Sequence, residues 1–310
     1  MRISASVSTV PHTSLSTTVA LLDQSDVDSY HLDSIEDPGI FKFAENLRKI
    51  TEKPFDLHLI TSQPEKYWDL IRASDIELVH FQLENLHRPL FVPDDLKARV
   101  GLAMQPHTPA EHFSVYRSEA ASVLLMLTTP GKSGGAFHPR YFEHIIRFKE
   151  LYPEKKITVD GGVNHEVAAV LRLMGIQTSV SGSFILKHEN ISEALHLLRF
   201  YDDIPWTLSE VMAQGTDWLR SDNERFGVLP DSYYLDMDGV ITDITADAAW
   251  QNQLEHIATF KDAIGRGLFA PLHLPLKNLK QATTQLRNAP NYVFAVDEHQ
   301  SIRGTFFLQN

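Results

Sequence analysis

The sequence predicts an α/β protein built as a (β/α)8 TIM barrel followed by a smaller C-terminal α+β domain. In the first 200 residues, eight short apolar runs bounded by turn residues alternate with stretches of helical spacing. Eight such alternations are the number that closes a (β/α)8 barrel. Beyond residue 200 the pattern changes to a polar segment followed by less regularly spaced strands. A doubly wound open sheet is the competing arrangement, because spacing alone does not exclude it.

The expected strands share β-branched or aliphatic residues, and the expected helices repeat apolar residues three or four positions apart. The strands are Arg2–Val7, Ser29–Asp33, Phe55–Leu59, Ile76–Phe81, Arg99–Ala103, Ser122–Leu127, Lys156–Val159 and Thr178–Ser181. The helices are Pro38–Thr51, Pro64–Ala73, Pro109–Glu119, Pro139–Leu151, His165–Met174 and Ile191–Leu198. Enzymes of this fold carry their chemistry at the C-terminal ends of the strands, so functional residues are expected there.

The chain is expected to hold two domains, because 310 residues exceed one average domain. We assign residues 1–200 to the barrel, residues 201–227 to a connecting segment and residues 228–310 to an accessory domain. In the accessory domain the pattern predicts a helix and four strands, the last two forming a β-hairpin. The helix is Lys277–Arg287, and the strands are Asp231–Thr242, Phe269–His273, Tyr292–Val296 and Ile302–Phe307.

Composition limits the classes of partner. Hydrophobic residues make up 43% and charged residues 22% of the chain, as in ordinary globular proteins. The net charge of −12 argues against a nucleic-acid groove, which needs clustered Lys and Arg. Cysteine is absent, so a metal must be bound by His, Asp or Glu. The first residues are too polar for a signal-peptide core, and no apolar run is long enough to cross a bilayer, so we expect no membrane partner and a cytoplasmic location.

Acids and histidines gather at the ends of three expected strands. They stand in His31-Leu32-Asp33, in Asp56-Leu57-His58 and in Val159-Asp160-Gly161-Gly162. Alternate residues of a strand share one face, so His31 and Asp33 are expected to point the same way. Three such strand ends meeting at one place would form a mononuclear metal site with two carboxylates. A single histidine at a strand end is more often an ordinary hydrogen-bonded residue, so this interpretation depends on the whole set.

Glycines follow the last two barrel strands. Gly161 and Gly162 come after the seventh strand, and Gly182 and Ser183 come after the eighth. Barrels commonly hold a phosphate there, because glycine lets backbone amides approach an anion closely. The same residues could instead form a tight turn and a helix N-cap, and the cap is compatible with an anion site.

Taken in order, these motifs resemble the ribulose-phosphate 3-epimerase family over roughly residues 1–200. His31-Leu32-Asp33 corresponds to the family's His-Val-Asp, and Asp56–Ile60 corresponds to its Asp-x-His-Leu-Met. The remaining matches are Ala5-Ser6-Val7, Gly101–Pro109, Val123–Met126 before Pro130-Gly131, Val159–Gly162 and Ser181-Gly182-Ser183. Each motif is weak alone, and the ordered set is specific.

The resemblance implies metal-dependent 3-epimerisation of a ketose phosphate. The substrate would be ribulose 5-phosphate and xylulose 5-phosphate, or a hexulose 6-phosphate. By the match, His31, Asp33, His58 and Asp160 bind one divalent metal, and Asp33 and Asp160 are the two acid–base residues. Two imidazoles and two carboxylates suit Zn, Fe, Mn or Co. The reaction would pass through an enediolate stabilised by the metal, with one carboxylate on each face of the sugar.

The resemblance also implies which residues bind the substrate, and it shows where this chain differs from the family. The expected substrate-binding residues are Ser6, Met126, Gly134, Gly135, Gly161, Gly162, Gly182 and Ser183, with a loop at Pro130–Phe137. The loop Ile35–Gly39 is shorter than the family's, Pro130–Gly135 lacks the family's glutamine, and His80-Phe81-Gln82 replaces His-x-Glu. Loops carry specificity on a rigid barrel, so these differences bear on which sugar binds more than on the chemistry.

Two further patterns lie in the C-terminal region. Leu235–Val240 is similar to the first motif of haloacid-dehalogenase-type phosphatases, but too few residues follow for the rest of that machinery, and a turn is the default. Residues from about Phe269 to Leu308 weakly resemble half of a cystathionine-β-synthase (CBS) module. Such halves pair, so we expect a homo-oligomer, with the C-terminal domain as a candidate interface. The alternative function is a non-catalytic barrel that serves as a scaffold, ligand sensor or assembly protein.

Overall fold

The computed structural model describes residues 1–128 and 137–211, together with the backbone of six C-terminal strands. Its contacts divide the chain into two compact units. The first comprises Met1–His138, Tyr152–Arg172 and Ile176–Tyr201, and the second comprises Pro139–Leu151, Leu173–Gly175 and Asp202–Asn310. All the residues considered below for the functional site belong to the first unit.

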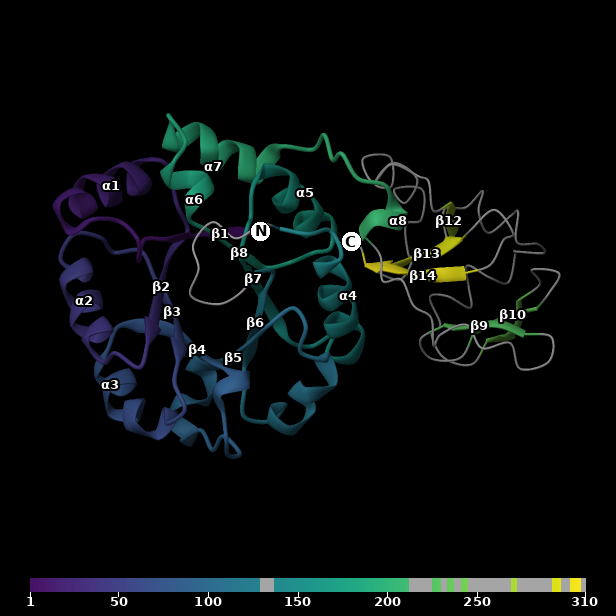
Figure 1. The fold of residues 1–310 in the computed structure, drawn as a ribbon, viewed down its shortest axis with the longest axis horizontal. Helices are drawn as coiled ribbons and strands as arrows, with labels where there is room; N and C mark the ends of the chain where they lie inside the picture. Colours follow the sequence, from purple (N-terminus) through teal and green to yellow (C-terminus); the bar gives the residue numbers. More distant parts are fainter. Residues whose placement is uncertain are drawn as a thin grey trace. The chain divides into compact units, whose positions relative to one another are not determined.

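Eight parallel strands form a closed barrel in sequence order (Figure 1). They are β1 Arg2–Ser6, β2 Ser29–Ile35, β3 Phe55–Ile60, β4 Ile76–Gln82, β5 Val100–Met104, β6 Ser122–Met126, β7 Lys156–Asp160 and β8 Thr178–Ser181. The barrel closes because β1 pairs with β8, with Ala5 opposite Ser181. The TIM barrel is therefore confirmed, and the open-sheet alternative is wrong. Every expected barrel strand is present within two residues of its expected ends.

Helices lie outside the ring of strands (Figure 1), and two expectations about them need correction. The helices are α1 His12–Gln24, α2 Gly39–Arg48, α3 Trp68–Ala73, α4 Tyr141–Leu151, α5 His165–Leu173, α6 Ser183–Leu186, α7 Ile191–Phe200 and α8 Leu208–Val211. The expected helix Pro109–Glu119 is only a 3-10 segment, η4 Ala110–Tyr116, and η1 Pro64–Tyr67, η2 Leu83–Asn85 and η3 Asp94–Arg99 are of the same kind. Helix α1 was not expected, since its many Ser and Thr residues favour caps and turns, but Leu15, Val19 and Leu22 give it a buried stripe.

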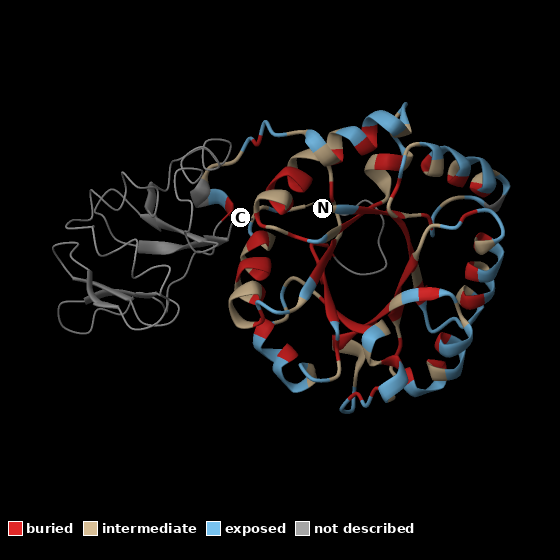
Figure 2. Ribbon diagram, turned by 180° about the vertical axis from the view of Figure 1, so that it is seen from behind, coloured by how far each residue is buried: buried red, intermediate tan, exposed pale blue. Residues whose placement is uncertain are grey.

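The strands of the barrel are buried (Figure 2). Every residue of β5 and β6 is buried, as expected for parallel strands covered on both faces. Among the described residues, the buried polar side chains come largely from barrel strands, and they include Ser4, His31, Asp56, His58, His80 and Gln82. The barrel therefore carries a buried polar set that only a dense network of partners could stabilise.

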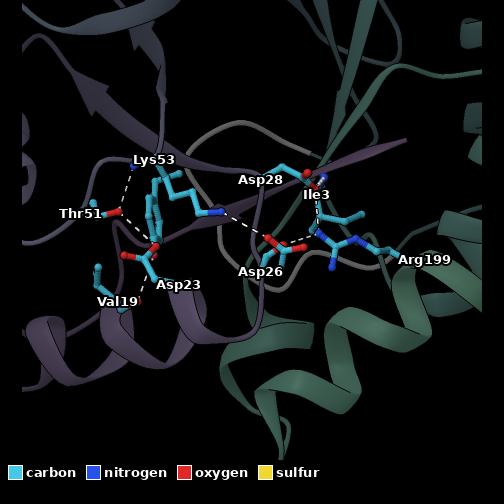
Figure 3. A network of polar contacts seen from close by, with 9 residues as sticks. Ile3, Val19, Asp23, Asp26, Asp28, Thr51, Lys53 and Arg199 are labelled. Carbon is cyan, nitrogen blue, oxygen red and sulfur yellow. Dashed lines mark hydrogen bonds and ion pairs between the residues drawn. The ribbon is translucent and has the colours of Figure 1, made fainter.

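A polar network joins helix α7 to the first strands (Figure 3). The Asp28 carboxylate accepts hydrogen bonds from the backbone N–H of Ile3 at 2.8 Å and from Arg199 of α7 at 2.9 Å. Nearby, the Asp23 carboxylate accepts from the Tyr30 hydroxyl at 2.7 Å and from Thr51 at 3.1 Å. The ends of the barrel sequence are thus held together by side chains as well as by the β1–β8 ladder.

Beyond residue 211 the structure describes two three-stranded sheets. The order β11-β10-β9 joins β9 Arg225–Leu229, β10 Tyr233–Asp236 and β11 Ile241–Ile244, and the order β12-β13-β14 joins β12 Phe269–Pro271, β13 Tyr292–Val296 and β14 Ile302–Phe307. The expected hairpin is confirmed, because β13 and β14 pair antiparallel. The expected single strand Asp231–Thr242 is wrong, because β10 and β11 are two separate strands that pair antiparallel.

Several expectations for this region stay predictions. The helix Lys277–Arg287 and the second half of the Leu235–Val240 motif lie outside the described residues. The likeness to a CBS module and the boundaries 1–200, 201–227 and 228–310 are not tested by these strands, although β9 begins inside the expected connecting segment. Within the described part of the chain, no helix combines the length and apolarity that crossing a membrane requires.

Candidate active site

Two neighbouring strands bring three of the expected metal ligands together. His31 and Asp33 are two residues apart on β2, and Asp33 is paired in register with His58 on β3. Asp33 Oδ1 lies 3.3 Å from His31 Nε2 and 3.4 Å from His58 Nδ1. One ligand atom from each residue lies within 4.8 Å of the other two, so His31, Asp33 and His58 form a compact donor set that could hold a metal ion.

The far nitrogen of each imidazole is held by an oxygen. His31 Nδ1 contacts the Asp56 carboxylate, which also accepts a hydrogen bond from Ser4 Oγ at 2.6 Å. His58 Nε2 lies 2.6 Å from Gln82 Oε1. In a neutral imidazole the nitrogen facing an acceptor carries the proton, so the other nitrogen keeps its lone pair. When neutral, each ring would therefore keep its lone pair on the nitrogen nearer Asp33, which is the nitrogen that a metal would need.

Asp160 lies on the wall of the adjoining pocket. It ends β7, in register with Met126 of β6. The pocket has a volume of about 260 Å³, and Asp33 and Asp160 both line it. Its other lining residues are Ser6, Ser8, Thr9, Ser34, Ile35, Ile60, Met126, Thr128, Gly161, Gly162, Val163, Val180, Gly182 and Ser183. Asp160 is not part of the three-residue cluster, so its role as the fourth ligand stays a prediction.

The pocket also gathers the expected substrate-binding residues. Ser6, Met126, Gly161, Gly162, Gly182 and Ser183 all line it, although they come from four different strands or strand ends. Gly134 and Gly135, with most of the expected loop, lie outside the described residues. These residues thus share one pocket, while their contact with a substrate remains a prediction.

The turn after β7 requires glycine. Gly161 has φ +106° and Gly162 has φ +64°, both in the region that side chains disfavour. A Cβ at Gly161 would lie 2.4 Å from Thr128 Oγ1. The two glycines therefore let the backbone pass close to the end of β6 and keep side chains out of the pocket at this point.

The two pocket carboxylates hold their protons differently. Burial by itself would raise the pKa of Asp33, but the His31 and His58 rings beside it hold that pKa well below its usual range. Burial raises the pKa of Asp160 to about 6, with Asp33 adding to the increase and His31 opposing it. For His31, burial alone would lower the pKa, but the Asp56 and Asp33 carboxylates raise it well above its usual value. One pocket therefore contains a firmly ionised carboxylate and one that titrates near neutral pH.

Some residues that organise the site were not expected from the sequence. Asp56 stands in one of the motifs but has no expected role, and Ser4 is not among the expected site residues. Gln82 was noted only as a difference from the family. The available signal was strand alternation: Asp56 stands two residues before His58 and pairs in register with His31. Gln82 stands two residues after His80 on the next strand. The sequence alone does not show which group each side chain faces, because that depends on how the strands are arranged in the barrel.

Comparison with known proteins shows which ones this chain is similar to. The ribulose-phosphate 3-epimerase of Bacillus subtilis (strain 168) is 24% identical over 213 residues, which cover 64% of this chain and 98% of that protein. The enzyme of the same name from Methanocaldococcus jannaschii is 26% identical over 212 residues, covering 64% and 90%. A solved 3-hexulose-6-phosphate synthase aligns with 15% identity and a TM-score of 0.48, covering 64% of this chain and 98% of that one. The model of the ribulose-phosphate 3-epimerase family matches residues 2–186, and the chain belongs to that family.

Proposed function

We propose that this protein catalyses the metal-dependent 3-epimerisation of a ketose phosphate. The substrates would be ribulose 5-phosphate and xylulose 5-phosphate, or a hexulose 6-phosphate. The observation that supports this best is the pairing of Asp33 and Asp160 on one pocket, next to the His31, Asp33 and His58 cluster. Membership of the family and the relatives of that name point to the same reaction.

Inversion at C3 requires a proton to leave one face of the sugar and another to arrive on the opposite face. Asp33 lies two residues before the end of β2 and Asp160 ends β7, and these strands are not neighbours in the barrel. Two carboxylates from separate strands can therefore address a substrate from different sides. The imidazoles beside Asp33 hold its pKa well below the usual range, and burial raises the pKa of Asp160 to about 6, so the two carboxylates differ in how readily they carry a proton. One carboxylate would take the proton and the other would supply it, and these roles exchange when the reaction runs in reverse.

The residues present fit a divalent metal. His31 Nε2, Asp33 Oδ1 and His58 Nδ1 form the cluster, and Asp160 is the proposed fourth ligand. Two nitrogen and two oxygen donors suit Zn, Fe, Mn or Co. Such an ion, when bound, supplies a Lewis acid for the negative charge that develops on the substrate oxygens. Asp56 and Gln82 keep the two rings oriented for it, independently of which metal is used.

The phosphate of the substrate is proposed to bind beside Gly162, Gly182 and Ser183. These residues line the same pocket as the two carboxylates. At Gly182 a Cβ would lie 3.2 Å from Ser6 Cβ, so glycine keeps this end of the pocket open. Backbone N–H groups can hold an anion locally whatever the net charge of the protein, so the charge of −12 does not oppose this assignment.

The test is an epimerisation assay in deuterated water with purified protein and each candidate metal. Ribulose 5-phosphate and a panel of hexulose 6-phosphates are supplied, and formation of the 3-epimer with deuterium at C3 is followed by NMR. Asp69→Asn is a matched control, because Asp69 is an exposed carboxylate of α3 outside the pocket. We expect turnover in the wild type and in this control. No epimer with any metal, together with no bound metal, would favour the non-catalytic scaffold instead.

A further inference from the structure

We propose that Glu84 sets the protonation pattern of His58 through the side-chain amide of Gln82, and so prepares His58 Nδ1 to bind the metal. Glu84 and Gln82 are positioning residues here, since neither belongs to the metal cluster and neither lines the pocket. This inference rests on the proposed metal-dependent function. It identifies residues outside the metal ligands that control how His58 presents its nitrogen to the metal.

The first step is the contact between His58 and Gln82. Both side chains are almost completely buried, and His58 Nε2 lies 2.6 Å from Gln82 Oε1. An amide offers an oxygen that accepts or an NH2 that donates, depending on which way it is turned. With the oxygen toward His58, the ring carries its proton on Nε2. With the amide reversed, the proton would move to Nδ1 and face Asp33, where it would block the metal position.

The second step is what fixes the amide. Gln82 Nε2 donates to the carboxylate of Glu84 and to the backbone carbonyl of Ala103, the latter at 3.4 Å. Both partners accept in these contacts. Reversing the amide would place Gln82 Oε1 against these two oxygens, with no donor between them. An unsatisfied buried polar group costs about 1–3 kcal/mol, so the observed orientation is strongly favoured.

The third step is what fixes Glu84. Its Oε1 accepts hydrogen bonds from the backbone N–H of Gln105 at 2.9 Å and from the Thr108 hydroxyl. Its Oε2 accepts from Gln82. Three donors converge on this carboxylate, so both of its oxygens act as acceptors. The chain of contacts therefore runs from the segment after β5, through Glu84 in η2 and Gln82 at the end of β4, to His58 in β3.

The chemistry of the relay suggests an exchange experiment. Glu84→Gln replaces the acceptor by an amide that can turn either way, so Gln82 is no longer held in one orientation. Adding Gln82→Glu in the same chain restores a fixed direction. The new carboxylate then accepts from His58 and from the amide at position 84, whose oxygen still accepts from Gln105 and Thr108. The contacts with His58, Gln105 and Thr108 are recovered with the charge moved from position 84 to position 82, and only the weaker bond to the Ala103 carbonyl is lost.

We would measure the affinity of the full-length chain for Zn²⁺ and Co²⁺ by competition with a chelator. Glu84→Gln is expected to weaken binding on the order of 10–100-fold, the usual effect of losing an outer partner of a metal-binding histidine. The double variant Glu84→Gln/Gln82→Glu should return to within a few-fold of the wild type. A purely structural role for Glu84 predicts the opposite, a double variant at least as weak as the single one. Glu77→Gln is the control, because it makes the same change at an exposed position of β4 outside the relay, and it should have little effect.

A second readout follows the ring itself. Nitrogen NMR of His58 in the metal-free protein, under mildly alkaline conditions where ordinary imidazoles are neutral, reports which nitrogen carries the proton. We expect the Nε2–H form in the wild type and the double variant, and a mixture in Glu84→Gln. Should Glu84→Gln fail to fold, Gln82→Met, which removes the acceptor at nearly the same size, gives the same comparison.

The outcomes separate the two proposals. A wild type that binds no metal contradicts the proposed function, while the NMR result still decides the relay. A Glu84→Gln protein that binds metal like the wild type and keeps only the Nε2–H form overturns the relay and leaves the proposed function standing.

Discussion

Asp160 lies in an environment unlike that of a surface carboxylate. Its burial and the nearby Asp33 raise its pKa to about 6, and it lines the same pocket as Asp33. We predict that Asp160→Asn lowers epimerisation by about 10²–10⁴-fold, because one of two proton-transfer groups is lost. The fold should persist, since the amide has the same shape. Deuterium incorporation at C3 measures the effect, and near wild-type turnover would show that Asp160 is not a base.

His58 allows a direct test of the metal site. Its Nδ1 lies 3.4 Å from Asp33 Oδ1, and its ring is buried. We predict that His58→Ala loses most of its bound divalent metal, as measured by elemental analysis of protein purified with the metal present. His87→Ala is the matched control, because His87 is exposed and lies outside the cluster. Equal metal content in the two variants would contradict the assignment.

Metal binding to the metal-free protein should depend steeply on pH. A ligand must lose its proton to bind a metal, and the pKa values of His31 and Asp160 are both raised. Above about pH 6 the proton of His31 is the one displaced, so affinity should rise about tenfold per pH unit. Below about pH 6 Asp160 is also protonated, and the dependence should approach a hundredfold per unit. Calorimetric titration over this range checks both slopes, and a flat profile would refute the shared involvement of these residues.

At the scale of elements, the junction between α7 and the first strands invites a stability test. Arg199 and Asp28 are largely buried, and Asp28 also accepts from the backbone of Ile3. We predict that Arg199→Ala lowers the free energy of unfolding by about 1–3 kcal/mol, because a charge-assisted hydrogen bond is lost. Lys53→Ala removes a pair with Asp26, whose side chain is 89% exposed, and should change it by no more than about 0.5 kcal/mol. Chemical denaturation of both variants makes the comparison, and equal losses would argue against a special role for this junction.

The strands and helices differ in how well they can be predicted from the sequence. Buried parallel strands appear as apolar runs, so the eight strands and their ends could be predicted. In helix α1 the residues of the buried stripe stand among Ser and Thr residues, so the helical pattern is weak. The 3-10 segment η4 is too short to show a full helical pattern. The cluster of His31, Asp33 and His58 follows from strand alternation and from the order of the motifs. The contact between Asp56 and His31 and the orientation of the Gln82 amide depend on strand register and on neighbours from other strands. A single sequence does not show either of these.

At the scale of the whole molecule, the barrel holds all the described site residues, and Ser183 is the last of them. The chemistry should therefore not need the C-terminal strands. One contact decides where the chain can be shortened. Trp206 packs edge-on against Phe142 of α4, with ring centroids 5.9 Å apart, so a cut before Trp206 would uncover Phe142.

We predict that a chain ending after Val211 keeps its metal and its turnover and loses self-association. The strands β12, β13 and β14 form one small sheet whose β12–β13 pair is parallel and whose β13–β14 pair is a hairpin. A small sheet of apolar sequence has surface that a second copy could cover, which is why we assign assembly to this region. Light scattering and metal analysis test the shortened chain against the full one, and a chain ending after Tyr201 serves as the less stable control. If the chain ending after Val211 binds metal but has no turnover, the C-terminal region instead completes the active site beside the short Glu36–Gly39 loop, and its assignment to assembly is wrong.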